Sequence, residues 1–209
     1  VTLFKSSFPA RFGGRLSSVI DVRTNDGDMQ KYHGTFSIGL LTSKINLEGP
    51  IIKGKTSFNI SARRSYLDLL AKPFMPDDEK YSYYFYDMNA KINHKFSDRS
   101  RMFLSAYHGK DHFAADYDGN TDFKDGSNMG WGNTIVSARW NYIFNNRLFS
   151  NTTVSYNNYL FDVNAYTNNQ YSTGAGAIIL NRYSSNYHSG ITDWSYQIDF
   201  DYNPTPAHH

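Results

Sequence analysis

The chain has 209 residues, a formal net charge of +2 and no cysteine. The lack of cysteine excludes disulfides and thiolate metal sites, and the near-neutral charge argues against a protein that binds nucleic acid by neutralising phosphates. Tyr and Phe are frequent (17 and 15 residues), although hydrophobic residues make up only 40% of the chain. This composition is typical of a β-rich protein with polar turns. The sequence contains no run of 18 apolar residues, so it predicts no transmembrane helix.

The first 29 residues differ from the rest of the chain. The sequence begins at Val1, without Met and without a leader of charged and then apolar residues, so we interpret it as a fragment or a processed piece. Gly13-Gly14 permits a tight backbone bend, and residues 16–23 are predicted to form a strand. Residues 25–28 are rich in Asn, Asp and Gly, which predicts a turn.

Eight strands are predicted from alternation of apolar and polar residues with a period of two. The pattern is clear at 57–66, 84–95, 132–144 and 191–202, and weaker near 32–40, 43–51, 101–110 and 148–162. In the clearest case one face carries Thr192, Trp194, Tyr196, Ile198, Phe200 and Tyr202, and the other Asp193, Ser195, Gln197, Asp199 and Asp201.

The connections are expected to alternate in length. Short ones are predicted at 49–55, 97–100 and 145–147, and long loops at roughly 67–82, 111–131 and 163–190. Short turns at one end and long loops at the other are typical of a transmembrane β-barrel, and the aromatic residues near the strand ends would form its interfacial girdles. A soluble β-sandwich also alternates, but the strongly polar faces opposite the aromatic residues favour a water-filled lumen.

Four segments resemble the TonB-dependent outer-membrane receptors, particularly their Bacteroidetes-type members. The first resembles the end of the plug domain of that family and the other three resemble the start of its barrel. They are Phe12-Gly13-Gly14-Arg15-Leu16-Ser17-Ser18-Val19-Ile20-Asp21-Val22-Arg23-Thr24, His33-Gly34-Thr35-Phe36-Ser37-Ile38-Gly39, Leu47-Glu48-Gly49-Pro50 and Ser61-Ala62-Arg63-Arg64-Ser65-Tyr66. The resemblance is specific over residues 8–66, and beyond them it lies in the rhythm of strands and loops.

This resemblance implies an all-β fold in two parts. Residues 1–29 would be the C-terminal end of a plug, and residues 30–209 the first eight or so strands of a transmembrane antiparallel β-barrel of 22 strands. The protein would lie in the outer membrane of a Gram-negative cell, in contact with lipid. It would capture a nutrient (a siderophore, vitamin, haem, glycan or peptide) at extracellular loops and import it past the plug.

The same resemblance implies partners outside the chain. TonB would act through an N-terminal part that precedes these residues, and a surface lipoprotein is a further candidate partner. No cofactor and no nucleic-acid partner are expected. The chain lacks the sequence motifs of zinc proteases and serine hydrolases, so it is not expected to be an enzyme.

Three local motifs suggest sites. Residues 49–56 match the letters of a P-loop, but the residues that follow alternate as a strand, so a hairpin turn is the better interpretation. Residues 116–127 resemble a calcium loop without its Gly and Glu, which leaves a looser metal site as a hypothesis. Its candidate ligands are Asp116, Asp118, Asn120 and Asp122, with His108 and His112 at the start of the same region.

We also expect a contact between plug and wall. Arg15 is the most suitable cation of the N-terminal segment, and Glu48 lies on the polar face of the second predicted strand. Because charges in a partly dried lumen need partners, Arg15 and Glu48 are predicted to pair. Two alternatives stay open at this point. The chain could be a complete eight-stranded outer-membrane barrel with a structural or adhesion role, or a soluble β-domain of an envelope protein.

Overall fold

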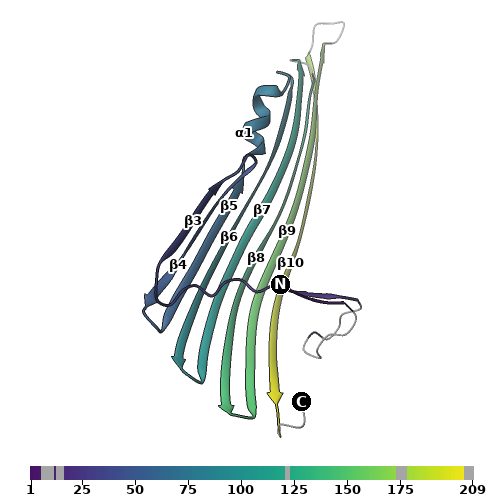
Figure 1. Cartoon of the computed structure of the whole chain (residues 1–209). Helices are drawn as coiled ribbons and strands as arrows, with labels where there is room; N and C mark the ends of the chain where they lie inside the picture. Colours follow the sequence, from purple (N-terminus) through teal and green to yellow (C-terminus); the bar gives the residue numbers. More distant parts are fainter. Residues whose placement is uncertain (6–11, 13–16, 121–122, 173–177, 205–209) are drawn as a thin grey trace.

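The structure is a computed structural model that describes residues 1–5, 12, 17–120, 123–172 and 178–204. Most of the chain forms one antiparallel sheet in which every strand pairs with its neighbours in sequence (Figure 1). All eight strands predicted from the alternation are present. They are β3 (His33–Ile38), β4 (Thr42–Ile52), β5 (Thr56–Ser65), β6 (Glu79–Ser97), β7 (Ser100–Asn120), β8 (Phe123–Asn145), β9 (Leu148–Ser172) and β10 (Ile178–Tyr202).

The strands lengthen steadily along the chain, which contradicts two of the predicted long loops. β7 and β8 occupy nearly all of 111–131, and β9 and β10 nearly all of 163–190. The error has a physical cause. Apolar residues in these stretches lie on the opposite side of the sheet from those nearer the short turns, so a period-two pattern read through both halves loses its phase.

The other predicted connections match more closely. The turns that join β4 to β5, β6 to β7 and β8 to β9 are short, as predicted. The region 67–82 contains a helix, α1 (Leu67–Ala71), a 3-10 turn, η2 (Lys72–Phe74), and then the start of β6. No helix in the described part of the chain is long and apolar enough to span a membrane.

The described N-terminal residues include a small sheet separate from the large one. Two short strands, β1 (Thr2–Phe4) and β2 (Val19–Asp21), pair with each other, which confirms a strand within 16–23. The chain then runs across the lower half of the sheet to reach β3 at its edge (Figure 1). We call residues 24–32 the crossing segment, and the side of the sheet on which it lies the covered face.

The two faces differ in the lower half of the sheet. The strand register brings polar residues together on the covered face and apolar residues on the other side, which we call the open face. One row on the covered face is Asn59, Lys91, Ser105, Ser137, Ser155 and Ser195, and the next row on the open face is Ile60, Ala90, Ala106, Val136, Tyr156 and Trp194.

Burial in this chain is the reverse of that in a soluble domain. The buried polar side chains are Thr56, Ser57, Asn59, Ser65, Asn93 and Ser150, and Phe103 is the one buried large hydrophobic side chain of the described residues. On the open face, Val136 is 47% exposed and Trp194 71% exposed. Soluble proteins bury such residues and rarely leave a continuous apolar surface of this extent uncovered.

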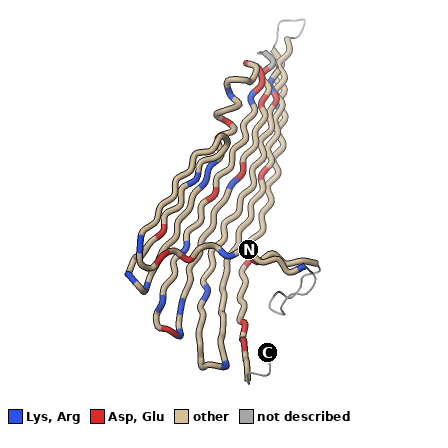
Figure 2. Tube along the Cα trace, viewed as in Figure 1, with Lys and Arg blue, Asp and Glu red and all other residues tan. Residues whose placement is uncertain are grey.

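The sheet is open at both edges. In the described residues, β3 and β10 each pair with one neighbour only, and they do not pair with each other. The eight strands therefore do not close into the small complete barrel that was one of the alternatives. Figure 2 shows that charged residues gather at the lower turns, along the crossing segment and toward the upper ends of the strands.

Candidate functional site

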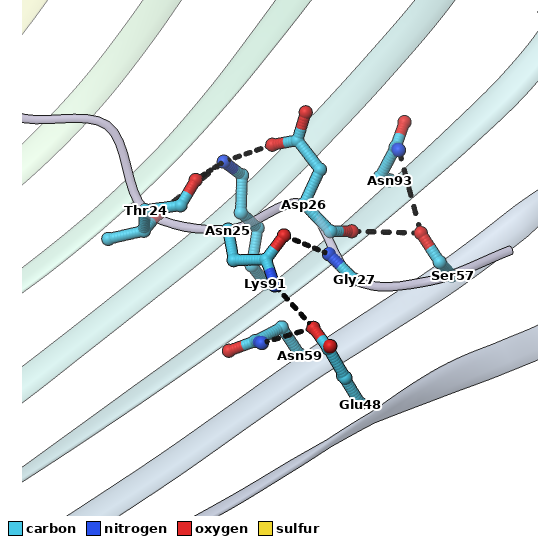
Figure 3. Close-up of polar contacts among 9 residues, drawn as sticks. All are labelled: Thr24, Asn25, Asp26, Gly27, Glu48, Ser57, Asn59, Lys91 and Asn93. Atoms are coloured by element: carbon cyan, nitrogen blue, oxygen red, sulfur yellow. Dashed lines mark hydrogen bonds and ion pairs between the residues drawn. The ribbon is translucent and has the colours of Figure 1, made fainter. Parts of the chain in front are cut away.

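Lys91 anchors the crossing segment to the sheet. Its side chain projects from the covered face of β6, forms an ion pair with Asp26, and donates to the carbonyl oxygen of Thr24 at 3.1 Å and to Thr24 Oγ1 at 3.4 Å (Figure 3). The Lys91 side chain is only 11% exposed. A cation with so little access to water needs oxygen partners, and the crossing segment supplies them.

Glu48 makes a second contact with the same segment. Its Oε2 accepts hydrogen bonds from Asn25 Nδ2 at 2.5 Å and from Asn59 Nδ2 at 3.0 Å (Figure 3). The expected partner, Arg15, lies outside the described residues, so the Arg15–Glu48 pair stays a prediction. The described partners are neutral amides, which carry no charge signal that would reveal them in the sequence.

The backbone of the crossing segment lies directly on β5. Ser57, which is fully buried, donates from Oγ to the carbonyl oxygen of Asp26 at 2.8 Å, and Asn93 donates to the same Ser57 Oγ at 3.5 Å. Gly27 has a φ of +80°, and a Cβ at this position would lie 2.3 Å from the carbonyl oxygen of Phe58. Only glycine fits a left-handed backbone in such close contact with a strand.

Asp28 forms the turn that redirects the chain toward β3. Its Oδ1 accepts from the backbone N–H groups of Gln30 at 2.6 Å and Lys31 at 3.1 Å, and its Oδ2 lies 2.9 Å from His33 Nε2. These hydrogen bonds, led by the one from Gln30, hold the pKa of the Asp28 carboxyl below its ordinary value. The chain is therefore redirected by a turn that begins at Asp28, the last residue of the turn predicted at 25–28, and continues to Lys31.

A cavity of about 440 Å³ lies between residues 21–26 and the covered faces of β6 to β10. Its lining is rich in charge and amide groups, with Lys91 and Arg139 facing the carboxylates of Asp21, Asp26 and Asp199. The Arg139 guanidinium lies 4.5 Å from the centre of the Phe103 ring, and its buried Nε has no hydrogen-bond partner within the described residues. A polar cavity of this size can hold water or further polypeptide.

Higher on the strands the covered face becomes aromatic. Tyr83 donates to Asp111 Oδ1 at 3.3 Å, and the rings of Phe161 and Tyr187 meet edge to face with centroids 6.1 Å apart. We call this the aromatic surface; the register places on it Tyr83, Phe85, Tyr107, Phe113, Trp131, Tyr159, Phe161 and Tyr187. Sequence reasoning missed this surface for two reasons. Phe113, Trp131 and Tyr187 fell in predicted loops, and Phe85 lies on the face of the predicted strand 84–95 that was expected to be polar.

The candidate metal ligands are not gathered at one point. His108 Nδ1 lies 2.9 Å from Thr134 Oγ1, and His112 lies against the ring of Tyr84. The two histidines share the open face, but they are four positions apart on one strand, about 13 Å, which is too far for one ion.

The acidic candidates have other partners. Asp116 accepts from Tyr166 at 3.0 Å, and Asp118 pairs with Lys124 at 3.0 Å. Asn120 ends β7, and Asp122 lies outside the described residues. Within the described residues no three His, Cys, Asp or Glu side chains could hold a metal ion together.

The P-loop letters form a hairpin, as predicted. β4 ends at Ile52 and β5 begins at Thr56, so a strand follows where a nucleotide site needs a helix. Gly54 in the turn has a φ of +71° and donates its N–H to the carbonyl oxygen of Met29 at 3.0 Å. The hairpin therefore supports the crossing segment.

Comparison with protein-family models, with curated proteins and with solved structures found no match to this chain. Its functional assignment therefore depends on the polarity of the sheet, the docked N-terminal segment and the resemblance carried by residues 8–66.

Proposed function

We propose that this chain is part of a TonB-dependent outer-membrane transporter. In this proposal the eight-stranded sheet is the first part of the barrel wall and residues 1–29 are the end of the plug. The observation that carries the proposal is the reversed polarity of the lower half of the sheet, with apolar side chains on the open face and polar ones buried on the covered face. Lipid would cover the first set, and the plug and water the second.

The dimensions of the apolar region support this assignment. On β8 the apolar positions of the open face run from Val136 to Phe144, a span of about nine residues, which is close to the length of a membrane-crossing strand. With strands tilted by about 40°, this span covers roughly 20 to 25 Å. The rings of Trp140, Tyr142 and Phe144 stack along its lower end, where an interfacial girdle is expected.

The crossing segment supports the plug part of the proposal. It is held to the wall by the Lys91–Asp26 ion pair and by hydrogen bonds from β4, β5 and β6, and the ring of Tyr32 also contacts Phe58. Such a contact suits a domain that fills a polar lumen. The polar cavity beside it leaves room for further plug residues or for water.

The aromatic surface supports a role in capture. In the proposed orientation it lies on the lumen side, above the crossing segment and toward the cell exterior. Rings with adjacent hydroxyl, amide and carboxylate groups provide stacking and hydrogen bonding for a nutrient that approaches the plug. TonB would act on plug residues that precede this chain, and a surface lipoprotein remains a candidate partner at the outer end.

Single cysteines on adjacent residues of β8 test the proposal, because the chain has none of its own. Val136→Cys would face lipid and Ser137→Cys the lumen. In outer membranes from cells that express the full-length protein without other cysteines, a water-soluble maleimide should label Ser137→Cys and leave Val136→Cys for a lipid-soluble maleimide. Equal labelling of both by the water-soluble reagent, or recovery of the protein in the soluble fraction, would contradict a barrel wall.

A further inference from the structure

A row of cationic and aromatic side chains borders the apolar region on the open face. Beyond Ala62, Met88 and His108, the next row in register is Arg64, Tyr86 and Lys110, from β5, β6 and β7. At this level β5 and β7 therefore change from apolar to basic residues, and β6, which lies between them, carries the ring of Tyr86.

Both cations are accessible. The Arg64 side chain is 58% exposed, and its guanidinium lies 5.4 Å from the centre of the Tyr84 ring, which orients it along the sheet. Its one ion pair is with Asp68 at 3.6 Å, which leaves most of its five N–H donors available. Lys110 is exposed and has no ion pair with a carboxylate of the described residues.

Several acidic groups on this side of the sheet already have partners. Asp162 pairs with His188, and Asp116 accepts from Tyr166. Lys124 pairs with Asp118 farther up the strands. Arg64 and Lys110 are thus the cations that stand in the row next to the apolar rows.

We propose that Arg64 and Lys110 bind the phosphate of an anionic lipid headgroup whose acyl chains lie on the apolar rows of the open face. This inference rests on the proposed function, since it requires lipid on that face. The two Cα atoms are two strand spacings apart, about 10 Å, and long side chains span that distance to meet one phosphate. Arg provides paired donors for phosphate oxygens, and Lys a mobile point charge.

The amphiphilic pattern identifies a lipid in preference to a soluble anion. A soluble phosphate needs the cations alone, whereas this site adjoins a continuous apolar surface that includes Ala106, Met88 and Ile60. Basic residues next to the hydrocarbon region attract anionic headgroups in this way, by an amount that corresponds to roughly a fivefold preference for each cation.

Lipid retention by the purified full-length protein tests the inference. The protein is placed in nanodiscs of phosphatidylcholine with a minor fraction of phosphatidylglycerol, released in the gas phase, and its bound lipids are identified by native mass spectrometry. The wild type should retain phosphatidylglycerol preferentially, and the double variant R64Q/K110Q should lose that preference by about 25-fold. Lys124→Gln is the matched control and should retain it, and Arg64→Lys should retain most of it.

Each other outcome has a definite meaning. A double variant that retains phosphatidylglycerol as the wild type does would overturn the inference. Release of the lipid by excess inorganic phosphate would also overturn it, in favour of a soluble-anion site. A protein that inserts into nanodiscs without preferring either lipid would remove this site and leave the transporter proposal intact, whereas a protein that does not insert would remove both.

Discussion

The lower and upper halves of the long strands have opposite polarity. On β7, Ala106 and Leu104 lie on the open face of the lower half, with Ser105 on the covered face. In the upper half of the same strand, His112 lies on the open face and Phe113 on the covered face. The change occurs without a break in hydrogen bonding, because β7 is continuous from Ser100 to Asn120.

This difference shows that one continuous strand can reverse the polarity of its two faces along its length, so that each half suits a different environment. In the lower half, the side without the crossing segment is apolar and the covered side is polar. In the upper half, the covered side collects aromatic rings and the other side is polar. In the proposed transporter, a membrane around only the lower half would account for both arrangements, since the upper open face would then meet water.

From this comparison we expect a charge introduced on the open face to destabilise the protein strongly in the lower half and only weakly in the upper half. Ala106→Arg places a cation among the apolar rows and should destabilise the full-length protein in lipid by about 2–4 kcal/mol. Ala114→Arg, on the same face of β7 but in the upper half, should cost at most about 1 kcal/mol. Urea unfolding in lipid vesicles measures both. Equal costs would mean that the two halves share one environment.

On the covered face of the lower half, substitution of Gly27 should also be strongly destabilising. Gly27→Ala adds a Cβ to a left-handed backbone that touches Phe58, and should weaken docking of the crossing segment by about 1–3 kcal/mol. Gly54→Ala has a similar φ of +71° but open space around its Cβ, so its cost should be smaller. Amide hydrogen exchange of residues 24–32 measures the difference. If the amides of residues 24–32 exchanged at the same rates in the two variants, the close contact between Gly27 and Phe58 would be unimportant to docking.

The ion pair of Lys91 should contribute more than an exposed pair of the same type. Asp26→Asn removes the charge partner of a nearly buried lysine, and should weaken docking of the crossing segment by about 1 kcal/mol. Lys95→Gln breaks the Lys95–Asp98 pair, in which Asp98 is 92% exposed, and should have almost no effect. The same hydrogen-exchange experiment gives both values. A larger effect of Lys95→Gln would show that burial of Lys91 is not what matters.

The smallest effect should be a dependence on pH at the turn before β3. The pKa of Asp28 is lowered in the folded protein, so its charged form stabilises the turn above the ordinary value of 3.8. This stabilisation is lost as the pH falls through the lowered pKa. Protection of Gln30 and Lys31 amides should therefore decline only in acid, and Asp28→Asn should flatten the curve. A decline that begins near neutral pH would contradict the role given to Asp28.

The sequence predicted much of the fold and less of the site. Period-two alternation located all eight strands, whereas the turn predicted at residues 25–28 ended where the turn formed by Asp28 begins. The aromatic surface was missed because a single alternation phase was followed along strands whose polarity reverses. The contact of Lys91 with Asp26 joins parts of the chain that are too distant in sequence for any local pattern to pair.

The amino-acid sequence by itself determined the strands, their short turns and the alternation of polar and apolar residues, because these depend on the local geometry of the β-strand. Only the tertiary structure decided which residues share a face at each level, where the polarity reverses, and which groups hold the crossing segment. Those features depend on the register between strands and on contacts between distant segments. The clearest example is the set of hydrogen bonds that Lys91, Glu48 and Ser57 form with residues 24–27.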